Sequence, residues 1–108
     1  SSQPVAIVTG GAGPGIGHGL TEALVEEGWR VVLTDRKPDR GHALAERLGR
    51  EVIEVVPVDV TESDAPERTV RAALGRFGRI DGLVNNVGVG LAKLAGDVTD
   101  DEFMNLFN

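Results

Sequence analysis

The sequence lacks several features that would place the chain in other protein classes. It has no cysteine, which excludes a disulfide framework, a thiolate metal site and a cysteine nucleophile. Its 11 Lys and Arg against 17 Asp and Glu give a net charge of −6, which disfavours nonspecific DNA or RNA binding. No apolar run approaches the roughly 18–20 residues of a membrane span, and the N-terminus lacks a signal-peptide layout. We therefore expect a folded cytoplasmic chain without nucleic-acid or membrane partners.

Glycine is abundant, with 15 residues among 108, and the glycines are clustered between apolar runs. Short apolar runs alternate with amphipathic stretches in the order strand, helix, strand. We expect strands at 5–9, 30–34, 52–58 and 83–85, and helices that end at Gly28, Gly49 and Gly78. After a loop at 89–98, residues 99–102 have the capping-box spacing of a further helix. This order predicts an α/β fold, a doubly wound parallel sheet with strand order 3-2-1-4.

Helical spacing of apolar residues predicts which face of each helix packs on the sheet. The residues that follow this spacing are Ile16, Leu20, Ala23 and Leu24 in the first helix, Leu44 and Leu48 in the second, Val70, Ala73, Leu74 and Phe77 in the third, and Phe103, Leu106 and Phe107 in the last. The chain ends within that last helix, whereas a doubly wound sheet usually continues with further strands.

The turn after the first strand carries the first candidate site. Gly11, Gly15 and Gly17 follow the spacing G-x-x-x-G-x-G between a strand and a helix. Without Cβ atoms, such a turn lets several peptide N–H groups face one pyrophosphate at a helix N-terminus. The strict G-x-G-x-x-G spacing and the lysine of the phosphate loop of nucleoside triphosphatases are both absent. The position favours dinucleotide binding, and the alternative is a turn that serves only strand–helix packing.

Asp35 follows the second strand, 18 residues after Gly17. An acid at this place accepts hydrogen bonds from the adenosine ribose hydroxyls and repels a ribose 2′-phosphate, which favours NAD over NADP. The adjacent Arg36 could pair with a phosphate and weakens this preference. The alternative is that Asp35 begins a solvated turn.

Two further polar segments follow the third and fourth strands. Asp59 and Val60 could meet the adenine, or Asp59 could belong to a helix-capping run. Asn86 and Gly88, after Asn85, could lie close to a ligand, or form a structural turn. All four segments fall at the carboxyl ends of successive strands, where open α/β sheets bind ligands.

These residues together resemble the short-chain dehydrogenase/reductase family. The resemblance rests on Thr9-Gly10 with Gly11, Gly15, Ile16 and Gly17, on Asp35, on Asp59-Val60, and on Asn85-Asn86-Val87-Gly88. It covers nearly the whole chain, with two departures: a one-residue insertion in the glycine turn, and Val87 where the family usually has alanine.

The resemblance implies that residues 1–108 are the N-terminal part of a single NAD(P)-binding Rossmann domain. The full-length protein would be an enzyme that transfers hydride between NAD, or less favourably NADP, and a small-molecule alcohol/carbonyl pair. In this reading Gly11, Gly15, Ile16 and Gly17 surround the pyrophosphate, Asp35 and Arg36 lie at the adenosine ribose, Asp59 and Val60 at the adenine, and Asn86 and Gly88 at the nicotinamide-side ribose.

The family's catalytic group of Asn, Ser, Tyr and Lys has no match in these residues, and the chain has no tyrosine. We therefore assign no catalytic residue and expect residues 1–108 alone to be inactive. The resemblance also implies a homodimer or homotetramer, with Phe103, Leu106 and Phe107 on a helix that packs against its twin. No metal site is expected, because His18 and His42 have no ligand-like neighbours.

Two other functions fit part of the pattern. One is a non-catalytic dinucleotide-binding module or sensor that keeps the pocket without the chemistry. The other is a methyltransferase that binds S-adenosylmethionine, which predicts an acid where Thr9 stands and has no use for Asn85-Asn86-Val87-Gly88.

Overall fold

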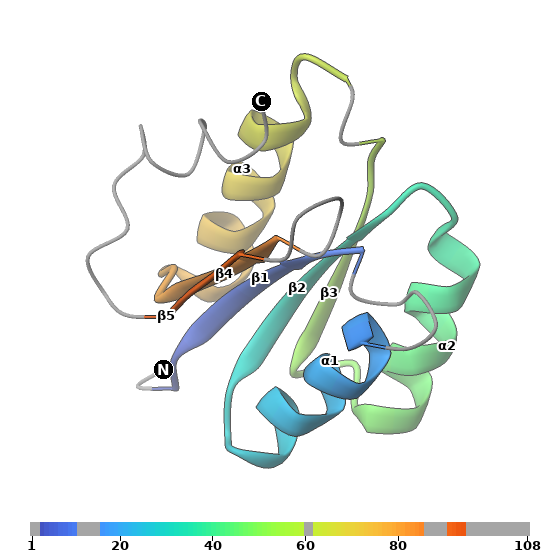
Figure 1. The fold of residues 1–108 in the computed structure, drawn as a ribbon, viewed down its shortest axis with the longest axis vertical. Coiled ribbons are helices and arrows are strands. Elements are labelled where there is room, and N and C mark those ends of the chain that lie inside the picture. The colour runs from blue at the N-terminus through green and yellow to red at the C-terminus, as the bar shows by residue number, and fades with distance from the viewer. Residues whose placement is uncertain (1–2, 11–15, 60–61, 86–90, 95–108) are drawn as a thin grey trace.

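The computed structural model describes residues 3–10, 16–59, 62–85 and 91–94 (Figure 1). Strands and helices alternate along most of this part of the chain, because β-branched runs alternate with amphipathic stretches. The elements are β1 (Val5–Thr9), α1 (Ile16–Glu26), β2 (Arg30–Asp35), α2 (Pro38–Leu48), β3 (Ile53–Pro57), α3 (Ala65–Phe77), β4 (Gly82–Asn85) and β5 (Leu91–Leu94).

The strands form one sheet in the order β3-β2-β1-β4-β5. The first four strands are parallel, which confirms the predicted order 3-2-1-4. The last strand is a correction: residues 91–94, predicted to lie in a loop, form β5, which pairs antiparallel with β4. Its four residues, Leu-Ala-Lys-Leu, are too few for strand periodicity to stand out, and pairing with β4 decides their conformation.

Helices cover both faces of the sheet. On one face α1 and α2 pack on Ala6 and Val8, and on the other face α3 packs on Val5 and Ile7 (Figure 1). Successive side chains of a strand point to opposite faces, so β1 is buried along its whole length. This burial explains its continuous apolar run.

The predicted faces of the first three helices are right in outline and wrong at two positions, and the predicted last helix with Phe103, Leu106 and Phe107 lies outside the described residues. In α1, Leu24 is buried as expected, but Ala23 is exposed and Thr21 is fully buried. In α3, Ala73 and Phe77 are buried, whereas Leu74 is 48% exposed. In α1 and α3, the buried stripe is therefore slightly rotated from the one that apolar residues alone suggest. A buried threonine can replace an apolar residue in such a stripe if its hydroxyl is bonded, as that of Thr69 is to the Ala65 carbonyl, at 2.8 Å.

A charged side chain ties the start of β1 to the segment before β4. Asp81 Oδ2 accepts a hydrogen bond from Val5 N at 2.8 Å, and Asp81 N donates to Val5 O at 2.7 Å. Arg79 holds the same carboxylate through two hydrogen bonds of 2.7 Å. The Arg79 bonds, and then the one from Val5, lower the pKa of Asp81.

β3 is an edge strand of the described sheet, and its last residue, Pro57, suits an edge position. Val31 N donates to Val52 O at 2.9 Å, so by alternation the peptide groups of Pro57 face away from β2. Proline offers no N–H there, and the Pro57 carbonyl accepts a hydrogen bond from Arg68 of α3 at 3.0 Å. Pro57 is the last residue of β3.

Candidate functional site

The carboxyl ends of the four parallel strands lie side by side. Thr9 is in register with Thr34 of β2 and with Asn85 of β4, and Asp35 is in register with Pro57 of β3. The segments that the sequence singled out therefore follow adjacent strand ends. This is the edge of an open α/β sheet at which ligands bind.

The chain turns sharply where β1 meets the glycine-rich segment. Gly10 has φ +65°, a left-handed conformation that suits glycine, and its N–H donates to Thr34 O at 2.7 Å. The buried Thr9 hydroxyl donates to Val84 O at 3.3 Å. These bonds fix the end of β1 to both neighbouring strands, so the chain enters the glycine turn from a defined position.

Asp35 is the best-defined candidate residue. It ends β2, and its side chain is only 7% exposed. Its Oδ1 accepts a hydrogen bond from Lys37 N at 2.9 Å, which orients the carboxylate. Its Oδ2 is buried and has no hydrogen-bond partner in the structure. A buried carboxylate oxygen without a donor is unfavourable by about 1–3 kcal/mol, so this atom is suited to accept a hydrogen bond from a ligand.

The cation that pairs with Asp35 is Arg40, which the sequence did not indicate. Arg40 Nη2 lies 3.5 Å from Asp35 Oδ2 and forms an ion pair with it, without a hydrogen bond. Arg36, the cation proposed from the sequence, is exposed. Arg40 is the third residue of α2, which begins at Pro38, three residues after β2 ends at Asp35. The short β2–α2 connection brings positions 35 and 40 together, so no pattern in the sequence indicates this pair.

Asp59 lies two residues beyond the end of β3. Its N–H donates to Glu62 Oε1 at 3.0 Å, and its carbonyl accepts from Glu62 N at 2.9 Å. The helix that follows begins at Ala65 with Asp64 in the capping position, so Asp59 does not cap it. The capping alternative is therefore wrong for Asp59, and its place near the adenine stays a prediction.

The other predicted site residues are described only in part. Ile16 and Gly17 are the first two residues of α1, and their place at the pyrophosphate stays a prediction. Gly11, Gly15, Val60, Asn86 and Gly88 lie outside the described residues.

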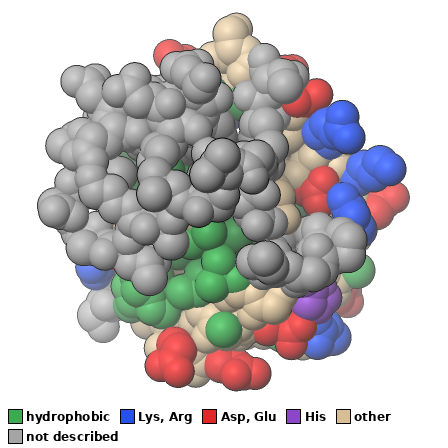
Figure 2. Space-filling model, viewed as in Figure 1, with side chains coloured by type: hydrophobic (Ala, Val, Ile, Leu, Met, Phe, Trp, Pro, Cys, Tyr) green, Lys and Arg blue, Asp and Glu red, His purple; other side chains and the backbone are tan. Residues whose placement is uncertain are grey.

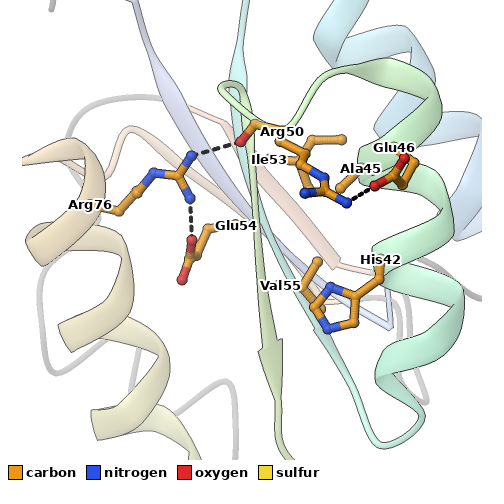
Figure 3. Close-up of a pocket in the computed structure, with 8 residues that line it drawn as sticks. All are labelled: His42, Ala45, Glu46, Arg50, Ile53, Glu54, Val55 and Arg76. Carbon is orange, nitrogen blue, oxygen red and sulfur yellow. Dashed lines mark hydrogen bonds and ion pairs between the residues drawn. The ribbon is translucent and has the colours of Figure 1, made fainter.

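A surface hollow of about 410 Å³ lies at the β3 edge, away from these strand ends (Figure 3). It is lined by residues of α2 and β3 and by Arg50 and Arg76. Arg76 pairs with Glu54 and donates to the Arg50 carbonyl at 2.7 Å, while Arg50 pairs with Glu46. Its charges are paired with one another, so the hollow offers no unpartnered charge to a nucleotide.

Helices α1 and α2 are joined by a cluster of polar side chains. Glu22 Oε1 lies 2.6 Å from His18 Nε2 and 3.0 Å from Arg47 Nη2. The Arg47 hydrogen bond is the main cause of a lowered pKa of Glu22. Figure 2 shows acidic, basic and His side chains close together at this margin of the molecule. His18 lies in the first turn of α1 and contacts α2 through this cluster.

Two kinds of feature are absent from the described part of the chain. There, no group of three or more His, Cys, Asp or Glu side chains could hold a metal ion. Within the same residues, no helix is long and apolar enough to cross a membrane.

Comparison with known proteins decides the family. The family model for short chain dehydrogenases matches residues 4–108. The chain belongs to the short-chain dehydrogenase/reductase family. The resemblance drawn from the glycine turn and the strand-end residues is thereby confirmed, and a methyltransferase is excluded.

Relatives of this short-chain dehydrogenase/reductase are oxidoreductases. An uncharacterized oxidoreductase of Staphylococcus aureus is 35% identical over 102 residues, which are 94% of this chain and 44% of that protein. A short-chain dehydrogenase/reductase from Brucella melitensis superposes with a TM-score of 0.75 at 35% identity, covering 92% of this chain and 42% of that one. L-Sorbose reductase from Gluconobacter frateurii, complexed with NADPH and L-sorbose, gives 0.73 at 32% identity, covering 95% and 40%. The chain thus spans less than half the length of these relatives.

Proposed function

We propose that this chain is the cofactor-binding part of an NAD-dependent oxidoreductase. The whole protein would transfer hydride between the nicotinamide and an alcohol or carbonyl substrate. When bound, the nicotinamide supplies the hydride acceptor or donor, and the residues described here bind and orient the adenosine end. Family membership and the arrangement of the strand ends support this proposal.

The observation that carries the proposal is the hydrogen bonding and burial of the two carboxylate oxygens of Asp35. Its carboxylate is oriented by Lys37 N through one oxygen, and the other oxygen is buried without a donor. The 2′- and 3′-hydroxyls of an adenosine ribose are donors that such an oxygen would accept. The residues present therefore fit the dinucleotide that the family uses.

The same carboxylate is the reason to propose NAD before NADP. A 2′-phosphate beside Asp35 would bring like charges together in a largely buried place. NADP is the second candidate, because L-sorbose reductase is complexed with NADPH and because Arg36 and Arg40 lie next to Asp35 in sequence or in space.

The remaining parts of the proposal follow the family. Gly11, Gly15, Ile16 and Gly17 would hold the pyrophosphate, Asp59 and Val60 the adenine, and Asn86 and Gly88 the second ribose. Residues 1–108 would form the N-terminal part of one Rossmann domain in a cytoplasmic homodimer or homotetramer.

Calorimetric titration with NAD tests the proposal. Asp35→Asn removes the charge but keeps an oxygen for Lys37 N, so the variant should fold and bind NAD about tenfold more weakly, the value of one charge-assisted hydrogen bond. Asp39→Asn is the matched control, because Asp39 is an exposed acid in the first turn of α2. The same affinity in both variants would exclude Asp35 from the site, and no NAD binding by the unsubstituted chain would refute the function.

A further inference from the structure

Asp35 and Arg40 form an ion pair whose two side chains differ in exposure. The Asp35 side chain is 7% exposed and held by Lys37 N, whereas the Arg40 side chain is 48% exposed. The guanidinium approaches Oδ2 at 3.5 Å without making a hydrogen bond. The carboxylate is therefore fixed, whereas the guanidinium is half exposed and makes no hydrogen bond to Oδ2, so it can turn away from the carboxylate.

Asp35 and Arg40 lie where bound NAD and NADP would differ, at the 2′-oxygen of the adenosine ribose. If the ribose hydroxyls bind Asp35 Oδ2, a phosphate on the 2′-oxygen would lie beside the same atom and within reach of Arg40. With NAD, the guanidinium can stay beside the carboxylate and leave room for the hydroxyl donor. With NADP, it can turn to the phosphate, where a guanidinium makes two parallel hydrogen bonds.

We propose that Arg40 is a cofactor-specificity residue that makes the site tolerant of a 2′-phosphate despite Asp35. The inference rests on the proposed dinucleotide binding at Asp35 and extends it. Asp35 sets the preference for NAD, and Arg40 limits how strongly NADP is rejected. Arg40 makes no contribution that depends on the identity of the alcohol or carbonyl substrate.

The test compares three variants by calorimetry with NAD, NADP, 5′-AMP and 2′-AMP as ligands. Arg40→Gln removes the charge, and Arg40→Lys retains it without the planar fork. Arg71→Gln is the control, because Arg71 is an exposed arginine of α3, on the opposite face of the sheet, and its loss changes the net charge by the same amount. Thermal unfolding of each variant checks that it is folded.

We expect Arg40→Gln to weaken binding of NADP and 2′-AMP about fivefold and to change binding of NAD and 5′-AMP less than about twofold. Arg40→Lys should recover part of the loss, and Arg71→Gln should show none of it. An equal loss for NAD and NADP in Arg40→Gln, or the same loss in Arg71→Gln, would overturn the role of Arg40 and leave the proposed function standing. If the unsubstituted chain binds none of the four nucleotides, both proposals are wrong.

Discussion

Two aspartates anchor opposite ends of the parallel strands and differ in what they bind. At the amino end, both oxygens of Asp81 are occupied by Arg79, and one of them also by Val5 N. At the carboxyl end, Asp35 has one oxygen occupied and one without a hydrogen-bond donor. A carboxylate whose acceptors are all used serves the fold, whereas one with an unused buried acceptor is suited to a ligand.

Asp81→Asn should lower the free energy of unfolding by about 1–2 kcal/mol at neutral pH, because charge-assisted bonds to Arg79 and Val5 become neutral ones. The pKa of Asp81 is lower in the folded chain than in the unfolded one, so its stabilisation is present above the usual carboxyl pKa, about 3.9, and is lost as the pH falls through the folded value.

Urea unfolding of wild type and Asp81→Asn across this pH range measures the effect. The difference between the two proteins should shrink as the pH falls below about 4. Asp39→Asn, an exposed acid without this network, should show a much smaller difference at neutral pH. A difference for Asp81→Asn that does not change with pH would mean that charge is not what Asp81 contributes.

The sequence indicated Asp35 as a site residue because its position, at a strand end and 18 residues after Gly17, is a feature of the chain itself. It did not indicate Arg40, because that partnership depends on how α2 starts. An ion pair between positions 35 and 40 is neither a helix nor a strand spacing. Contacts of this kind depend on the tertiary structure and leave no periodic pattern in the sequence.

At the scale of single elements, α3 contains two glycines with opposite requirements. Gly75 lies inside the helix, with open space where a Cβ would stand. Gly78 ends the helix at φ +80°, and its N–H bonds to the carbonyls of Ala73 and Leu74. The same substitution should therefore have opposite effects at positions three residues apart.

Gly75→Ala should raise the free energy of unfolding by about 0.5–1 kcal/mol through helix propensity, and Gly78→Ala should lower it by about 1 kcal/mol because alanine is strained at positive φ. Chemical denaturation of the two variants beside wild type gives both values, and each variant is the control for the other. Changes of the same sign would contradict the described end of α3.

The elements also show where periodicity is sufficient and where it is not. It located the three helices and their glycine ends, because each helix buries one face on the sheet. It placed Leu74 and Ala23 in the core wrongly, since an apolar residue on the flank of a stripe counts the same in the pattern as one at its centre. It missed β5, whose pairing with β4 is a tertiary contact.

For the whole molecule, the strand order makes β1 the most enclosed part of the sheet, with β2 and β4 bonded on its two sides and helices over both faces. We expect its amide protons to exchange with solvent more slowly than those of β3, because exchange there requires the sheet to open on a larger scale. Hydrogen exchange followed by NMR measures both sets. Faster exchange in β1 than in the edge strand β3 would contradict the described order.

The strand order could be predicted from the sequence because alternation of strands and helices, handed crossovers and the strand-end residues all favour one topology. The cofactor could be predicted only as a class. The choice between NAD and NADP depends on a balance of charges around one ribose oxygen, which is set by side-chain positions within a few ångströms.

The last residue of β3 also affects how copies of the protein can meet. A strand edge with alternating donors and acceptors can template another chain, and repeated addition of strands leads to fibrils. At Pro57 the donor is missing and the acceptor is occupied by Arg68. Addition of a further strand is therefore disfavoured at the carboxyl end of this margin, which protects the protein against two copies joining there through their β3 edges.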